Sequence, residues 1–298
     1  MKLFVCICLL TAVRADSDIY IPLSSINSSE VGIAASIDGI HNGAAINRPI
    51  SFGHTSLISF QSNQVSVASN RIVRLRNVEY AEPNIIFVPF GRSVLGIGPG
   101  SGFMRSYGPM AIVNSSWLVV NSTEEYFNDL CLPESISRLS VSHSDLLQGL
   151  TFQASLGFVH SRGAALRTIS MQVLFRNIAS GLILEVPERF RNSLLVGLLE
   201  DQGLVVGENN GLVRFDRCPA GQLPSIGITI ANGVRLLIHS EDYLRQDADG
   251  CSFVVGQSSS DIISLNPFLL KGVNFRVDQG SRESDGNILF CDSRDIYF

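Results

Sequence analysis

The feature that most constrains this chain is a long series of short, strand-like segments. Runs rich in Val, Ile, Phe and Thr recur along the sequence, and clusters of Gly, Ser, Asn and Pro separate them. The clearest turn signal is Asn232-Gly233, which lies between two apolar runs and supplies the positive φ angles of a tight hairpin turn. The sequence therefore predicts a mainly β fold with a hairpin over residues 226–238.

Two segments have a helical pattern instead. The first begins near Pro187 and Glu188, has Phe190 and Leu194 on one face, and is followed by Gly203. The second is a short helix predicted over residues 104–113. No low-complexity tract or Pro-rich linker divides the chain, so any two lobes must pack directly on each other.

The N-terminus has the pattern of a signal peptide. Lys2 precedes an apolar run from Leu3 to Val13, and Ala15 ends a small-residue cleavage pattern. The run is much shorter than the roughly 20 residues that span a bilayer. We expect residues 1–15 to be removed, and the mature protein to be secreted or lumenal in the secretory or endolysosomal pathway, with no membrane attachment.

Cleavage after Ala15 also removes Cys6 and Cys8. The mature chain then holds four cysteines, an even number that predicts two disulfides with three possible connectivities. These are Cys131, Cys218, Cys251 and Cys291. Asn-x-Ser/Thr sequons, the candidate glycosylation sites, begin at Asn27, Asn114 and Asn121.

Composition and motif spacing exclude several classes of function. The formal net charge of −5 and the absence of Lys/Arg clusters argue against nucleic-acid binding. The histidines are scattered without metal-ligand spacing, and the glycine-rich stretch 96–102 matches no nucleotide-binding motif. We expect a monomer without cofactor or metal.

Several ordered segments resemble the pepsin-like aspartic peptidase family. The strongest runs from Cys218 to Cys251 and contains LPSIGITIANG followed by DYL. Residues 93–104 are similar to the family's GILGLG segment, residues 126–133 to its FSxCLP segment, and residues 263–278 to its closing segment. The resemblance implies a bilobal β fold, with an N-terminal lobe at 16–145 and a C-terminal lobe at 146–298. It also implies a Cys218–Cys251 disulfide and leaves Cys131 and Cys291 as the candidate second pair.

The resemblance also implies two catalytic aspartates, which this sequence lacks. Such a peptidase needs one carboxylate from each lobe, and the two share a proton. Gly53 stands at the first position in the stretch Ile50–Leu57. Ala179 stands at the second, or Asn177 after a shift of one alignment position. We therefore expect no catalytic residue at either position.

Other residues could substitute for the missing pair. Asp201 and Asp278 occur in Asp-x-Gly sequences, but neither lies where the family places its catalytic turns. Asp38 is the N-terminal acidic residue to examine, and His54 adjoins Gly53 without an acidic neighbour. We expect none of these to be catalytic.

The family's flap, a β-hairpin that closes over the substrate, is also missing. Only about forty residues separate Phe52 from Val94, and no Tyr-Gly pair lies between them. The sequence favours a catalytically inactive protein that binds peptide or protein between its lobes. Two alternatives remain open: a divergent, active aspartic endopeptidase working at acidic pH, and a secreted inhibitor of hydrolases, a role that inactive branches of the family have taken.

Overall fold

The computed structural model describes most of the chain after residue 18. The described residues are 19–27, 30–60, 65–83, 85–89, 93–144, 149–159, 165–176, 178, 182–199, 206–209, 212–219, 223–230, 235–247, 250–270, 272–280 and 285–293. The predicted signal peptide lies outside this part.

A 13-stranded sheet runs through the whole molecule. Its path is β1 (Ile19–Pro22), β12 (Trp117–Val120), β11 (Met110–Val113), β25 (Val273–Gln279), β26 (Asp285–Asp292), β13 (Ser137–Ser144), β14 (Gly149–Val159), β15 (Ala165–Phe175), β24 (Ile262–Leu265), β16 (Leu184–Val186) and β23 (Val255–Gln257). Two further strands, β19 (Ser225–Ile230) and β20 (Arg235–Ile238), extend from β14.

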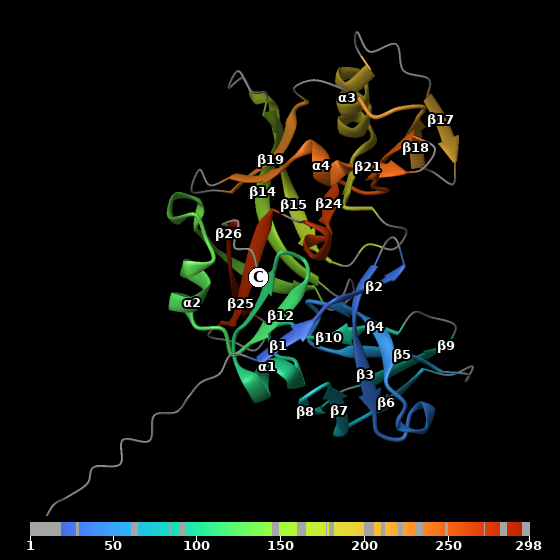
Figure 1. The fold of residues 1–298 in the computed structure, drawn as a ribbon, viewed down its shortest axis with the longest axis vertical. Coiled ribbons are helices and arrows are strands. Elements are labelled where there is room, and N and C mark those ends of the chain that lie inside the picture. The colour runs from blue at the N-terminus through green and yellow to red at the C-terminus, as the bar shows by residue number, and fades with distance from the viewer. Residues whose placement is uncertain are drawn as a thin grey trace, which may run out of the picture.

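Three smaller sheets complete the two lobes. Two of these sheets lie in the N-terminal half. The strand order of the first is β10 (Leu95–Gly96), β4 (Ile46–Ser51), β3 (Glu30–Ile37), β7 (Arg71–Leu75) and β8 (Val78–Glu82), and β2 (Ser24–Asn27) also pairs with β3. The strand order of the second is β5 (Ser56–Phe60), β9 (Ile85–Pro89) and β6 (Ser66–Ala68). In the C-terminal half, β17 (Val206–Asn209), β18 (Leu212–Phe215), β22 (Gly250–Phe253) and β21 (Leu244–Asp247) form the fourth sheet. Figure 1 shows the small sheets at opposite ends of the molecule, so the fold is mainly β and bilobal, as predicted.

The hairpin predicted around Asn232-Gly233 is confirmed. β19 pairs with β20 in antiparallel register from Ile226 opposite Ile238 to Thr229 opposite Arg235. The four turn residues, 231–234, lie outside the described part of the chain.

The predicted helices had different outcomes. α3 (Glu188–Leu199) follows Pro187 as predicted, with Phe190 and Leu194 buried. The helix predicted over 104–113 is wrong in its second half: α1 (Gly102–Tyr107) ends at Gly108, and Met110–Val113 form strand β11. Gly108 has a φ of 74°, which stops the helix, and Pro109 follows it.

Two further short helices follow strands of the large sheet. α2 (Glu124–Asp129) follows β12, and its N-cap Thr123 accepts a hydrogen bond from the backbone N–H of Tyr126. α4 (Ser240–Tyr243) follows β20. Among the described residues, no helix is long and apolar enough to cross a membrane.

Both disulfides occur in the structure. Cys218 pairs with Cys251, and Cys131 pairs with Cys291. The second pair is buried in a small cluster that includes Phe127 and Leu289. It therefore fastens the chain after α2 to strand β26, which lies 160 residues further on.

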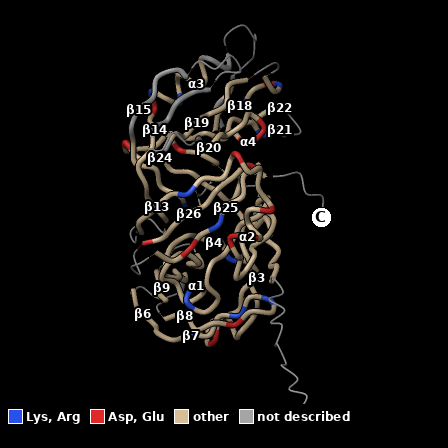
Figure 2. Tube along the Cα trace, turned by 90° about the vertical axis from the view of Figure 1, so that its left-hand side faces the viewer, with Lys and Arg blue, Asp and Glu red and all other residues tan. Residues whose placement is uncertain are grey.

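Charged residues are dispersed over the lobes. Figure 2 shows basic and acidic positions interspersed along the described trace, without a basic stripe. This distribution agrees with the absence of Lys/Arg clusters in the sequence.

Removing the long-range disulfide should strongly destabilise the protein. Loop-closure entropy for a separation of 160 residues is worth about 5 kcal/mol, against about 4 for the 33 residues of Cys218–Cys251. We expect the double variant Cys131→Ala/Cys291→Ala to lower the free energy of unfolding by about 3–5 kcal/mol in urea denaturation. The matched control is Cys218→Ala/Cys251→Ala, and a larger loss in the control than in the long-range variant would contradict the argument.

Candidate functional site

The first loop connects β4 to β5 and contains Gly53. Strand β10 runs parallel to β4, with Ile50 opposite Leu95 and Ser51 opposite Gly96. On its other side, β10 is joined to β5 by an antiparallel bridge between Val94 and Leu57. Strand β10 therefore lies between β4 and β5, the two strands that the first loop connects.

Backbone hydrogen bonds hold this first loop in place. The N–H of Ile97 donates to the carbonyl of Ser51, and the N–H of Gly98 donates to the carbonyl of Gly53, both at 3.0 Å. The N–H of Gly53 donates to Ser51 Oγ at 3.2 Å. None of these bonds needs a carboxylate, so the loop keeps its shape with glycine at its tip.

The second loop repeats this arrangement. Strand β24 runs parallel to β15, with Phe175 opposite Leu265, and antiparallel to β16, with Leu184 opposite Leu265. The loop between β15 and β16 contains Asn177, Ile178 and Ala179. Asn177 and Ala179 lie outside the described residues, whereas Ile178 is buried.

Neither loop contains an acidic residue between its flanking strands. Residues 52–55 are Phe-Gly-His-Thr, and residues 176–183 are Arg-Asn-Ile-Ala-Ser-Gly-Leu-Ile. The absence of a carboxylate therefore does not depend on which residue of the second loop corresponds to Gly53. Glu185, the acidic residue next along the chain, accepts a hydrogen bond from Arg176 Nη2 at 2.7 Å.

Aromatic rings pack beside the first loop. Phe52 stacks on Phe268 from the C-terminal half, with ring centroids 4.9 Å apart, and both side chains are fully buried. Phe268 belongs to the short 3₁₀ helix Pro267–Leu269, which follows β24. The contact therefore joins the two halves directly beside Gly53.

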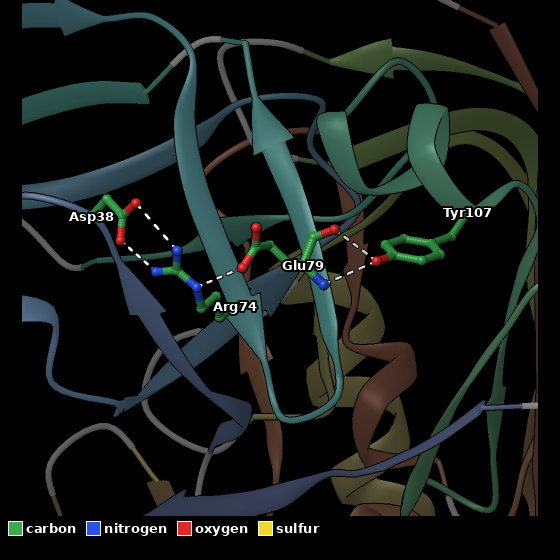
Figure 3. A network of polar contacts seen from close by, with 4 residues as sticks. All are labelled: Asp38, Arg74, Glu79 and Tyr107. Carbon is green, nitrogen blue, oxygen red and sulfur yellow. Dashed lines mark hydrogen bonds and ion pairs between the residues drawn. The ribbon is translucent and has the colours of Figure 1, made fainter.

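The other acidic candidates lie in structural ion pairs. Asp38, at the end of β3, binds both terminal nitrogens of Arg74, whose Nε donates to Glu79 Oε2 at 2.6 Å. The hydroxyl of Tyr107 contacts the backbone of Glu79 (Figure 3). Asp38 and Arg74 are about half exposed, which is the environment of a surface pair.

Asp278 is held on strand β25. Its Oδ2 accepts a hydrogen bond from Arg276 Nη1 at 2.7 Å. Burial raises the pKa of Asp278, while the charge and hydrogen bond of Arg276 oppose the rise. Asp201 lies outside the described residues, and His54 is half-buried in the first loop.

Sequence reasoning missed a buried carboxylate that contacts the first loop. Ser56 Oγ accepts a hydrogen bond from the N–H of Gly96 at 3.1 Å and donates to Glu82 Oε2 at 3.4 Å. Glu82 is fully buried at the end of β8. The signal was available, because Val78, Tyr80 and Glu82 alternate with exposed residues and so occupy the inward face of the strand.

A pocket of about 520 Å³ opens next to the second loop. Ile183 is the last residue of that loop, and Leu269 adjoins Phe268; both line the pocket. The remaining lining residues come from the Cys218–Cys251 region and from α4 and β21: Cys218, Pro219, Leu223, Ser240, Glu241, Asp242, Leu244, Arg245 and Gln246. The volume is typical of a site for a small molecule or a peptide side chain.

The described residues offer no metal centre. No three His, Cys, Asp or Glu side chains come together among them as metal ligands do.

Close backbone packing at the first loop should make Gly98 intolerant of a side chain. A Cβ at this position would lie 1.8 Å from the carbonyl oxygen of Phe52. We expect Gly98→Ala to lower the free energy of unfolding by about 3 kcal/mol or more, because backbone must shift. The control Gly272→Ala adds a Cβ in open space. Equal melting temperatures for the two variants would contradict the packing argument.

Glu82 should matter through the hydrogen bond it accepts. Glu82→Ala leaves Ser56 without this acceptor and opens a cavity, so we expect a loss of about 2–4 kcal/mol in chemical denaturation. Glu82→Gln keeps an oxygen acceptor of the same size and should lose much less. A Gln variant as unstable as the Ala variant would show that the charge, not the hydrogen bond, is required.

Comparison with known proteins supports the fold and nothing finer. No protein-family model matches this sequence, and no curated protein matches it. Among solved structures, the chain is similar to basic 7S globulin from soybean, with a TM-score of 0.61 and 9% identity over 91% of this chain and 94% of that chain. At this identity the likeness concerns the fold alone: the protein has the bilobal, pepsin-like fold that its sequence predicts.

Proposed function

We propose that this protein is a non-catalytic, pepsin-like binding protein of the secretory pathway. One observation carries the proposal: the loop around Gly53 keeps its hydrogen-bonded frame, while neither loop supplies a carboxylate. Two acidic groups are the minimum for aspartic peptidase chemistry, since one activates water and the other protonates the carbonyl oxygen. A frame maintained without them supports a role in binding rather than in hydrolysis.

The ligand in this proposal is a peptide or a protein segment. The pocket beside the second loop is lined by half-buried apolar side chains, including Leu223 and Leu269, and by exposed polar ones, including Glu241 and Gln246. Such a combination suits an apolar side chain whose backbone remains at the exposed polar groups. The described residues between β5 and β10 form the sheet strands β6, β7, β8 and β9. We therefore expect a bound peptide to lie without the family's covering flap.

The protein should not hydrolyse peptide bonds. Mature protein purified from a secreting host should leave an unfolded protein substrate intact between about pH 3 and 6, where carboxylate dyads work. An active pepsin-like peptidase is the positive control. Reproducible cleavage that disappears when a single carboxylate is substituted would contradict the proposal and favour a divergent endopeptidase.

Filling the pocket should weaken ligand binding. Gln246 is exposed and lines the pocket, whereas Val196 is exposed on α3 and does not. We expect Gln246→Trp to weaken binding to selected peptides by at least about tenfold, with Val196→Trp as the matched control. Equal dissociation constants for wild type and both variants, measured by calorimetry, would place the binding surface elsewhere.

A further inference from the structure

The three sequons differ sharply in their surroundings. Asn114 and Asn121 lie at opposite ends of the β11–β12 hairpin region, whereas the side chain of Asn27 lies outside the described part of the structure. The first two can therefore be compared directly within one structural unit.

Asn114 is engaged in the fold. Its Oδ1 accepts a hydrogen bond from Ser293 Oγ at 2.6 Å, and its backbone N–H donates to Asn274 Oδ1 at 3.0 Å. Asn274 is fully buried, and its Nδ2 donates to the carbonyl of Leu130. The carboxamide of Asn114 is thus half-buried and oriented by its neighbours, beside the Cys131–Cys291 disulfide.

Asn121 is exposed and makes no side-chain hydrogen bond to any residue that the structure describes. It follows β12 in a turn, with a φ of 57°, and its Oδ1 lies over Gly108, which has no side chain to crowd it. The next two residues are fixed: Ser122 is buried, and the Thr123 hydroxyl caps α2. Asn121 and Thr123 are thus exposed on either side of the buried Ser122, and a sugar attached to Asn121 displaces no packed group.

The position of Asn121 also matters for the large sheet. β1 pairs only with β12 among the described strands, so its other side is an open edge. The N–H of Leu23 donates to the carbonyl of Ser116 across the pair. Because backbone N–H groups alternate in direction along an antiparallel strand, the N–H of Tyr20 and the ring nitrogen of Pro22 face the other side.

Pro22 already blocks one end of this edge, since proline has no N–H to offer an incoming strand. Near the other end the N–H of Tyr20 faces away from β12, and Ile19 pairs with Val120, the residue before Asn121. Open edges of this kind promote association between copies of a chain.

We infer that Asn121 carries an N-linked glycan, and that this glycan covers the open end of strand β1. The inference rests on the proposed passage through the secretory pathway. Thr123 Oγ1 accepts the capping hydrogen bond from the N–H of Tyr126, and the exposed hydroxyl of this residue completes the sequon.

The test is secretion from a eukaryotic cell line, followed by digestion with an N-glycosidase. Asn121→Gln should remove one glycan's mobility shift, and Asn114→Gln should leave the pattern unchanged. Asn121→Gly is the second variant, because glycine suits the positive φ at this position and still removes the sequon. Secreted protein whose glycosylation is unaffected by both Asn121 variants would overturn the assignment.

Two further measurements test secretion and the shielding of strand β1 separately. Retention of the whole, unprocessed protein in the cytosol would overturn secretion, and with it this glycan, independently of binding or hydrolysis. Secreted Asn121→Gly should associate with itself at lower concentrations than wild type in sedimentation velocity. Identical sedimentation of the two proteins over the same concentration range would overturn the shielding role.

Discussion

The insertion of strands β25 and β26 between β11 and β13 holds this molecule together. β25 pairs with β11 through Met110 and Val277, and β26 pairs with β13 along six residues. Polar side chains on β25 reinforce the seam: Arg276 donates to the carbonyl of Ser122, and Asn274 bridges to the β11–β12 turn. Because these groups are buried and paired, strands from the two halves form one continuous sheet, which holds the halves in a fixed relative position.

Local sequence patterns predicted the elements whose signals are local. The β19–β20 hairpin and the Pro187 start of α3 have signals in neighbouring residues, and the paired strands and the helix formed where expected. The run Met110–Val113 was misjudged because four apolar residues have no period that separates helix from strand. The parallel pairings of β4 with β10 and β15 with β24 join distant segments, and no local pattern reveals them.

The candidate site was predictable only in part. Gly53 lies in the loop between β4 and β5, where β10 runs parallel to β4. Its correspondence to a catalytic position stays a prediction from the resemblance. The stacking of Phe52 on Phe268 required the relative position of two lobes. The burial of Arg48 was not predicted either. Its side chain is only 2% exposed, and its Nε and Nη2 lack hydrogen-bond partners among the described residues. Burial lowers the pKa of Arg48. Nothing in the surrounding sequence marks that side chain as buried.

The wide separation of Cys131 and Cys291 has a consequence for biosynthesis. On the proposed secretory route, Cys131 enters an oxidising compartment well before its partner has been translated, and Cys218 and Cys251 arrive in between. The earlier cysteine must therefore stay reduced, or be released from a wrong partner by thiol exchange, until β26 completes the sheet. Correct oxidation of this chain should thus be a late step that depends on disulfide isomerisation, and its yield should respond to the redox balance of the producing cell.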